Sequence, residues 1–147
     1  MDKATIGFGP HLMLDLYGCN KTKLNDKEFI YRLLDELPAQ INMTKITPPQ
    51  LTPYPGKEGS FDKGGISGFV LIAESHISIH TFVAQEHAFI DIFSCKPFDI
   101  EKAKQLLTTA LEAKKIDEQI TNRGLEFPKD IAASDEIIQE ERQEHIV

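Results

Sequence analysis

The chain has 147 residues, 41% hydrophobic and 27% charged, which indicates one soluble globular domain large enough to bury its own core. The formal net charge of −7 argues against a nucleic-acid partner, because sequence-independent binding needs lysine and arginine to neutralise phosphates. No run of about 18 apolar residues and no basic leader occurs, so we expect a cytoplasmic protein with no membrane partner and two reduced cysteines, Cys19 and Cys95.

The first third of the chain predicts a strand, a helix and a second strand. Leucines occupy every second position of residues 11–18, which is the pattern of a strand with one buried face. Asn25 has the features of a helix N-cap, and apolar residues follow at helical spacing until Pro38, where we expect the helix to end. We expect a strand over 43–47 and then a loop to about residue 65, marked by prolines and glycines, of a length that indicates disorder or function.

The second half predicts three strands, a helix and a final strand. The strands are expected at 68–73, 77–82 and 88–94, and Asp99 is a candidate N-cap for a helix with a regular apolar stripe. A last strand is expected over 115–121. The order of elements predicts an α+β two-layer sandwich, with a mostly antiparallel sheet and two helices on one face. An uncovered apolar sheet face favours a homodimer or a higher homo-oligomer.

The expected domain spans residues 1–128, and an acidic tail follows over 129–147. The tail carries six acidic and two basic residues. Such a composition is typical of a solvated helix or a frayed terminus.

Reactive polar side chains concentrate around the central strands. They are Ser67, Glu74, Ser75, His76, Ser78, His80, His87, Asp91 and Cys95. Each of them alone fits an ordinary polar residue that satisfies its hydrogen bonds at a strand end. So many in one stretch favour a functional site instead.

Two kinds of site can be built from these residues by chemistry alone. A metal site would combine three histidines with a carboxylate: His76, His80 and His87 with Glu74 or Asp91. Residues four apart on a strand lie roughly 13 Å apart, so a metal site would need a turn. A nucleophilic hydrolase would instead use Cys95 with His80 as its base.

The whole pattern is more specific than either of these sites. The run G-I-S-G-F-V-L-I-A-E-S-H-I-S-I-H-T-F (65–82), followed fifteen residues after His80 by Cys95 in D-I-F-S-C, resembles the prokaryotic S-adenosylmethionine decarboxylases, which are pyruvoyl enzymes. The resemblance extends from H-L-M-L-D-L-Y-G-C (11–19) through the second expected helix and leaves out the acidic tail.

The resemblance implies that the chain is a proenzyme that cuts itself between Glu74 and Ser75. The products are a β chain of residues 1–74 and an α chain that begins at position 75. The Ser75 hydroxyl attacks the Glu74 carbonyl, an N→O acyl shift gives an ester, and elimination with hydrolysis leaves a pyruvoyl group. The matching base for the elimination is His80, and Ser67 matches the serine that assists processing through a hydrogen bond to the cyclic intermediate.

The same resemblance implies the reaction of the processed enzyme. The pyruvoyl group forms a Schiff base with S-adenosylmethionine and accepts the electrons released with CO₂, which gives decarboxylated S-adenosylmethionine for spermidine synthesis. No free cofactor and no metal are required. Cys95 matches the proton donor to the product, and an unperturbed thiol is mostly protonated at neutral pH. Phe61 falls where the family has an aromatic residue that stacks on adenine, although an aromatic that only anchors its loop fits equally well.

One departure from the family pattern concerns the substrate. Relatives continue from the His-Thr pair with an aromatic residue and then Pro-Glu, whose glutamate holds the ribose hydroxyls. Here Phe82 keeps the aromatic residue, whereas Val83 and Ala84 replace Pro-Glu, and Glu86 is the candidate that could compensate if the strand carries a bulge. The change leaves open an arginine or ornithine decarboxylase on the same scaffold, or a non-catalytic regulatory paralogue.

Overall fold

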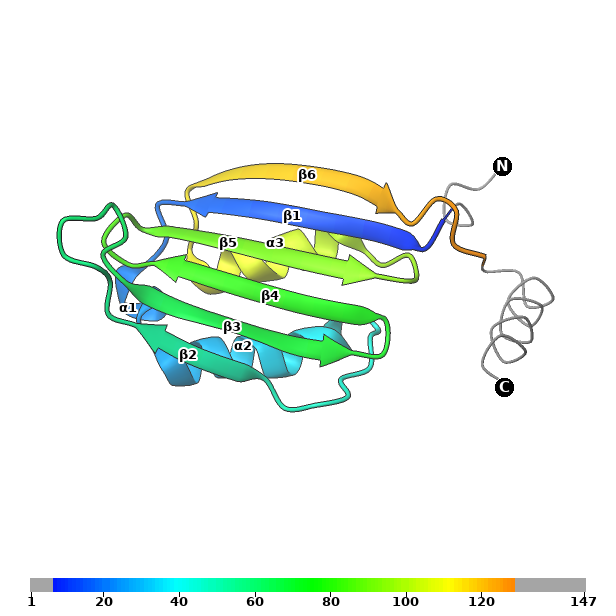
Figure 1. The fold of residues 1–147 in the computed structure, drawn as a ribbon, viewed down its shortest axis with the longest axis horizontal. Coiled ribbons are helices and arrows are strands. Elements are labelled where there is room, and N and C mark those ends of the chain that lie inside the picture. The colour runs from blue at the N-terminus through cyan, green and yellow to red at the C-terminus, as the bar shows by residue number, and fades with distance from the viewer. Residues whose placement is uncertain (1–6, 129–147) are drawn as a thin grey trace, which may run out of the picture.

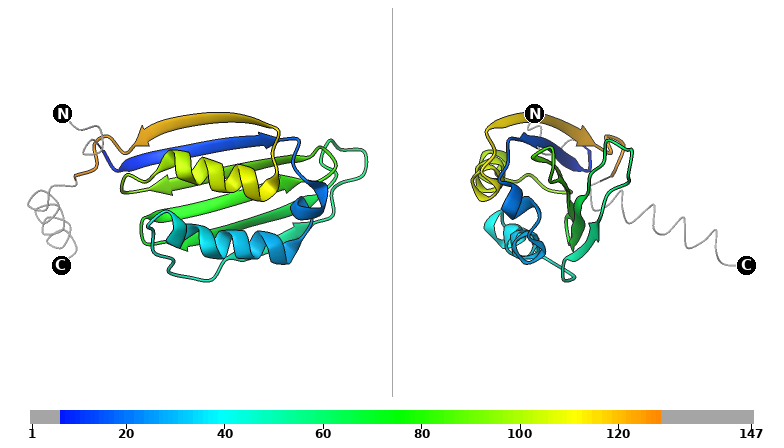
Figure 2. Two further views of the ribbon diagram at one scale, coloured as in Figure 1. Left: turned by 180° about the vertical axis from the view of Figure 1, so that it is seen from behind. Right: turned by 90° about the vertical axis from the view of Figure 1, so that its left-hand side faces the viewer.

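The computed structural model describes residues 7–128, in which a six-stranded sheet is covered on one face by helices (Figures 1 and 2). The elements are β1 (Gly9–Tyr17), α1 (Lys21–Leu24), α2 (Lys27–Gln40), β2 (Gln50–Tyr54), β3 (Gly65–Ile72), β4 (Ser75–Phe82), β5 (His87–Ser94), α3 (Ile100–Leu111) and β6 (Lys115–Arg123). The predicted α+β two-layer sandwich is confirmed, with the short helix α1 in addition. The predicted acidic tail, 129–147, lies outside the described residues.

The strands lie in the order β2-β3-β4-β5-β1-β6, and every neighbouring pair is antiparallel. β3, β4 and β5 follow one another as hairpins, whereas β1 inserts between β5 and β6. Only Ala73 and Glu74 connect β3 to β4, so that Ser75 is the first residue of β4. Antiparallel pairing over such a tight connection fixes the register, which places Ser67 opposite His80 and Ser75 opposite Ser94.

The core lies between the sheet and the helices α2 and α3. Alternate strand residues point toward these helices and are almost fully buried, because successive side chains of a strand face opposite sides. On the central strands they are Leu12, Leu14, Leu16, Ile77, Ile79, Ile90 and Ile92. The helices contribute apolar stripes to this core, formed by Ile30, Leu34, Leu37, Ala103, Leu107 and Leu111.

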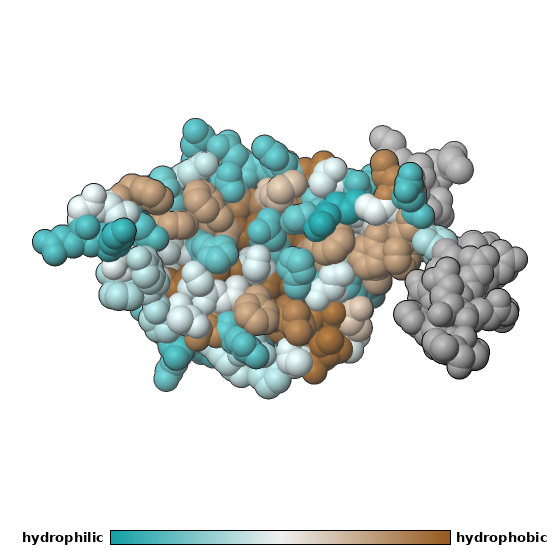
Figure 3. Space-filling model, viewed as in Figure 1, coloured by the Kyte–Doolittle hydropathy of each residue, from teal (hydrophilic) through white to brown (hydrophobic). Residues whose placement is uncertain are grey.

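The other face of the sheet has no helix on it, and Figure 1 looks onto this uncovered face. Its outward positions on β3 and β5 include Phe69, Leu71 and Phe89, which are 40%, 39% and 37% exposed. Apolar side chains are spread over this face among polar ones (Figure 3). Exposed aromatic and aliphatic side chains in the middle of a sheet are typical of a surface that binds a partner.

The strand predicted over 43–47 is wrong. There Lys45 forms only an isolated bridge to Ile72, and the real second strand, β2, lies at Gln50–Tyr54, inside the predicted loop. β2 forms an edge of the sheet and pairs with β3 alone. An edge strand tolerates a proline such as Pro53 because one side of its backbone needs no ladder hydrogen bond.

The boundaries of the predicted first helix are also wrong at both ends. The N-cap of α2 is Asp26, whose carboxylate accepts a hydrogen bond of 3.1 Å from the Phe29 amide, while Asn25 ends α1. Pro38 lies inside α2, which continues to Gln40. A proline in the last turn removes one backbone hydrogen bond near the end of the helix, so its cost is smaller than at the centre. None of the helices in residues 7–128 is both long and apolar enough to cross a membrane.

Candidate active site

The peptide bond between Glu74 and Ser75 lies at the tight connection between β3 and β4. Ser75 has a φ of 150°, whereas the other described non-glycine residues with positive φ have values of 55–62°, in the ordinary left-handed region. A side chain at such a φ costs on the order of 1–3 kcal/mol and persists only where the surrounding structure imposes it. Backbone strain is therefore located at the residue that the sequence predicts to be the nucleophile.

The carbonyl of the same peptide bond has a fixed hydrogen-bond donor. The main-chain N–H of Cys95 donates to the Glu74 carbonyl oxygen at 2.8 Å. This contact follows from the register, because Cys95 comes directly after Ser94, the partner of Ser75. A donor in this position stabilises negative charge that develops on the oxygen when a nucleophile attacks the carbonyl carbon. The Cys95 side chain is partly buried, and its sulfur is not part of a disulfide.

Ser67 and His80 form a second group of predicted residues. The Ser67 hydroxyl lies 2.8 Å from Nδ1 of His80, on paired positions of β3 and β4. Both side chains are on the uncovered face of the sheet, where His80 is exposed. The predicted pair is thus in direct contact, with an imidazole held in one orientation by a hydroxyl.

The two groups do not meet within one chain. His80 is five residues from Ser75 along β4, which corresponds to about 16 Å in an extended strand. Cys95 lies at the Ser75 end of the sheet. Within one molecule, His80 therefore cannot reach Ser75 to act in processing. It also cannot reach Cys95 to act as the base of a hydrolase.

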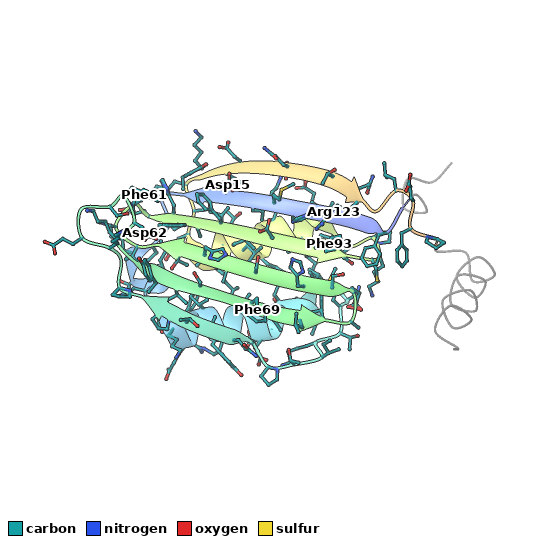
Figure 4. All side chains as sticks on the ribbon, in the orientation of Figure 1. Asp15, Phe61, Asp62, Phe69, Phe93 and Arg123 are labelled. Carbon is teal, nitrogen blue, oxygen red and sulfur yellow. The ribbon has the colours of Figure 1, made fainter. Side chains whose placement is uncertain are left out.

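The predicted substrate-binding residues lie further still from Ser75. Phe61 belongs to the loop between β2 and β3 and is 82% exposed, at the end of the sheet opposite Phe93 and Arg123 (Figure 4). Phe82 is the last residue of β4, about 23 Å from Ser75 by strand length, and its ring contacts Phe89 with centroids 5.3 Å apart.

Glu86 lies in the connection between β4 and β5. The register of these strands is continuous up to Phe82 opposite His87, so the strands carry no bulge before the turn. The Glu86 carboxylate lies 3.9 Å from the Lys21 ammonium. Ala84, for which the resemblance predicts a glutamate, is exposed, and Val83 packs against the core. Beside them, the Gln85 side-chain amide donates a hydrogen bond to the main-chain oxygen of Phe61.

Sequence reasoning missed a polar network on the uncovered face. His11 Nε2 lies 3.2 Å from the Asp91 carboxylate, which also accepts a 3.4 Å hydrogen bond from the Ser78 hydroxyl. His11, His76 and Arg123 surround the ring of Phe93. The strand alternation could have revealed the shared face of these side chains, but not the order of strands that brings β1, β4, β5 and β6 together.

This environment alters the acidity of His76. Partial burial lowers the pKa of its imidazole below the ordinary 6.5, and electrostatic interaction with His11 and Arg123 lowers it further, while Asp91 opposes the shift. His76 is therefore mainly neutral at pH 7. Its ring packs against Phe93 on the uncovered face.

The metal site considered from the sequence is not assembled. Within residues 7–128, no three His, Cys, Asp or Glu side chains are grouped so that they could hold a metal ion. His76 and His80 are spread along β4, and His87 lies opposite Phe82 at the end of the hairpin. The extended strand separates these histidines as its geometry requires.

Comparison with known proteins identifies the family of the chain. The model of the family described as S-adenosylmethionine decarboxylase matches residues 10–124. The S-adenosylmethionine decarboxylase proenzyme of Aquifex aeolicus (strain VF5) is 36% identical over 118 residues, covering 80% of this chain and 82% of that protein. The proenzyme of that name from Clostridium botulinum (strain Langeland) is 37% identical over 117 residues, covering 79% of this chain and 94% of that protein.

A solved structure extends the match to three dimensions. The crystal structure of the adenosylmethionine decarboxylase from Aquifex aeolicus VF5 aligns with a TM-score of 0.66 at 32% identity, over 86% of this chain and 98% of that chain. The residues matched by the family model include Ser67, Ser75, His80 and Cys95. The chain therefore belongs to the S-adenosylmethionine decarboxylase family.

Proposed function

We propose that the chain is a proenzyme that cleaves itself between Glu74 and Ser75 and, once processed, decarboxylates S-adenosylmethionine. The observation that carries the proposal is the geometry of the scissile bond. Ser75 is strained at a φ of 150°, and the Glu74 carbonyl already accepts a hydrogen bond from Cys95. Strain and a preorganised donor both lower the barrier to attack on that carbonyl. Residues 1–128 would form the decarboxylase domain, and the α chain would carry the acidic tail.

Self-cleavage needs only groups of the chain and water. The Ser75 Oγ forms a bond to the Glu74 carbonyl carbon, the C–N bond breaks, and the hydroxyl proton passes to the nitrogen, which leaves an ester. A base then removes the Ser75 α-proton, and the Cβ–O bond breaks with release of the Glu74 carboxylate. Water hydrolyses the resulting dehydroalanine end through its imine tautomer, so that ammonia leaves and a pyruvoyl terminus remains at position 75.

His80 is the base we assign to the elimination, with Ser67 holding its ring through Nδ1. Because His80 lies about 16 Å from Ser75 in its own chain, it can serve only the Ser75 of another copy. We therefore propose a homodimer in which each site combines Ser75 and Cys95 of one protomer with Ser67 and His80 of its partner.

The uncovered sheet face suits this assembly. It presents the exposed apolar side chains Phe69, Leu71 and Phe89 together with His80. When two such faces pack against each other about a two-fold axis that runs across the strands, opposite ends of the two sheets come together. The end of one sheet that carries Phe61 would then lie over the Ser75 end of the other sheet.

In the processed enzyme, the pyruvoyl group supplies an electron-accepting carbonyl for the electrons that CO₂ leaves behind. The Cys95 thiol, partly buried next to position 75, is the proton donor to the product carbon that we assign. Phe61 and Phe82 of the partner are assigned to substrate binding. Glu86 is left out, because it was a candidate only with a bulge in the strand and the register from Ser75 to Phe82 is continuous. We place the reaction in the cytoplasm, where its product would supply polyamine synthesis.

The comparisons favour S-adenosylmethionine over arginine or ornithine as the substrate. The matched family and the relatives described above all carry the name of that decarboxylase. The Val83-Ala84 departure alone supports the amino-acid decarboxylase or the non-catalytic paralogue, and neither is favoured. Ala84 is exposed and has no side-chain acceptor, so we expect weaker ribose binding than a glutamate at this position would provide.

Release of labelled CO₂ tests the proposed substrate. The purified chain is supplied in turn with carboxyl-labelled S-adenosylmethionine, arginine and ornithine at equal concentration. We expect release from S-adenosylmethionine alone. Release from arginine or ornithine only would reassign the substrate, and release from none of the three by a fully cleaved protein would contradict the proposed decarboxylation.

A further inference from the structure

A segment outside the predicted site lies along the scissile turn. We call residues 42–46, which lie between α2 and β2, the bracing segment. Its Thr44 carbonyl accepts a 2.8 Å hydrogen bond from the Ala73 N–H, and the Ile46 N–H donates to the Leu71 carbonyl at 3.1 Å. Lys45 adds an isolated bridge to Ile72. The bracing segment therefore fixes the last residues of β3 and the turn immediately before the scissile bond.

The bracing segment also holds the side chain of Glu74. The Thr44 N–H donates a 2.7 Å hydrogen bond to Oε1 of Glu74, and Glu74 is only 8% exposed. A carboxylate that is withdrawn from water must recover hydrogen bonds from the protein. Because a main-chain amide is the donor, this contact depends on the path of the bracing segment and not on the identity of the side chain at position 44.

Glu74 is consequently fixed at two points by segments from opposite directions in the sequence. Thr44 holds its side chain, and Cys95 holds its carbonyl oxygen. The next residue is Ser75, with its strained φ of 150°. A strained conformation persists only where neighbouring contacts determine it more strongly than the local backbone would choose. The contacts that flank the scissile bond on its Glu74 side are the ones able to impose that strain.

We propose that the Glu74 side chain, braced by the Thr44 amide, is a positioning residue for self-cleavage. It holds the scissile peptide in the conformation from which Ser75 Oγ attacks, so it acts on the N→O acyl shift and not on the later elimination. In that shift the Oγ–C bond forms, the C–N bond breaks and the hydroxyl proton moves to the nitrogen. The proposal rests on the proposed self-cleavage and adds the group that orients it.

The test follows processing of freshly synthesised full-length chains by the appearance of two fragments. Glu74→Gln keeps an acceptor oxygen at the same reach, and it should cleave within about twofold of wild type. Glu74→Ala removes the acceptor and Glu74→Asp withdraws it by one methylene, so both should slow cleavage about tenfold or more. Thr44→Ala is the matched control, because it changes the exposed side chain and keeps the N–H donor.

Hydroxylamine separates a positioning role from general damage to the site. Hydroxylamine cleaves the ester but not the peptide bond, so it rescues a variant that forms the ester and then stops. We expect His80→Ala to be cleaved by hydroxylamine, since only elimination is blocked, and Glu74→Ala to remain slow. Circular dichroism and thermal unfolding establish that each variant is folded.

The outcomes distinguish this inference from the proposed function. If the wild-type chain cleaves and Glu74→Ala cleaves at the same rate, the positioning role alone is overturned. Glu74→Gln as slow as Glu74→Ala would overturn it as well, even if Glu74→Ala proved poorly folded, because the acceptor is still present. A folded wild-type chain that never cleaves would overturn self-cleavage itself and the inference with it.

Discussion

His80 lies 2.8 Å from the Ser67 hydroxyl and yet five residues from Ser75 on the same strand. A β-strand cannot fold back over such a distance, so no rotamer of His80 reaches the Ser75 α-carbon of its own chain. The proposed catalytic elements are divided between the two ends of one sheet. Their division makes the second copy of the chain part of the chemistry and not only of the assembly.

Complementation between two inactive chains tests this division. Ser75→Ala lacks the nucleophile and His80→Ala lacks the base, so each alone should give little or no pyruvoyl chain. When the two are co-expressed, a mixed dimer has one site with the Ser75 of one chain and the His80 of the other. We expect the His80→Ala chain to be cleaved in the mixture, as mass spectrometry of differently tagged chains would show.

A second pair of variants controls that experiment. A chain carrying both Ser75→Ala and His80→Ala offers no intact base to its partner, so it should not restore cleavage of the His80→Ala chain. If the doubly substituted chain restored cleavage as well as Ser75→Ala does, the base would not come from His80 of the partner. Efficient cleavage of His80→Ala by itself would remove His80 from processing.

Cys95 is assigned two roles, one for its main-chain N–H in self-cleavage and one for its thiol in decarboxylation. One substitution can separate them. Cys95→Ala keeps the main-chain N–H that contacts the Glu74 carbonyl and loses the thiol. We expect the variant to cleave at close to the wild-type rate and to release CO₂ about 100-fold more slowly, the usual size of a lost acid–base catalyst.

The other cysteine is the matched control for the thiol. Cys19 is 3% exposed, and burial together with the nearby Glu86 raises the pKa of its thiol to about 11, so it is not available as a reactive group. Cys19→Ala should leave turnover per folded molecule unchanged. Unchanged turnover in Cys95→Ala would exclude the Cys95 thiol from the mechanism.

The turn at Val83-Ala84 allows a gain of binding to be tested. Ala84 is exposed at the position where the resemblance to the family predicts a glutamate, so Ala84→Glu places a charged acceptor there without displacing core atoms. A charge-assisted hydrogen bond of about 1.5–3 kcal/mol should lower the KM for S-adenosylmethionine about tenfold or more, with self-cleavage unaffected. Ala84→Gln, the neutral control, should improve KM less. An unchanged KM in both variants would show that the substrate is held elsewhere.

His76 predicts a dependence of stability on pH. Its pKa is lowered in the fold by partial burial and by His11 and Arg123, so the unfolded chain takes up the proton first as pH falls. The free energy of unfolding should therefore decline as pH falls below 6.5. The contribution of His76 to this decline should end once the pH is below the pKa of His76 in the folded chain. Urea unfolding of the uncleaved Ser75→Ala chain measures this, with His76→Gln in the same background as control. Equal pH dependence in the two chains would contradict the assignment.

The fold could be predicted where the hydrophobic period was regular. The prediction failed where tertiary contacts determine the structure. The leucines of β1 and the stripe of α3 determined those elements correctly. β2 was missed because its Pro53 is acceptable only at a sheet edge, and the edge position is a property of the assembled sheet. α2 continues beyond Pro38 to Gln40 because packing of its buried face against the sheet stabilises helical residues that local preference alone would not.

For the site, the sequence suggested candidate residues but not how they are arranged in space. The family pattern indicated Ser67, Ser75, His80 and Cys95 with separate roles, and the Ser67–His80 contact was not predicted. The Thr44–Glu74 contact joins residues thirty positions apart through a backbone amide, which leaves no mark on residue type. The separation of His80 from Ser75 could have been foreseen from strand length, since five residues of extended chain cannot bring two side chains together.

Mass spectrometry of the freshly purified wild-type protein, with and without borohydride reduction, tests self-cleavage most directly. We predict two fragments that divide after Glu74. The fragment from position 75 should be lighter by one ammonia than a fragment that begins with serine, and borohydride should add two hydrogens to it. Ser75→Ala should remain one chain. A folded wild-type protein that remains one chain, or that is cut after Glu74 but bears no reducible ketone, would contradict the account.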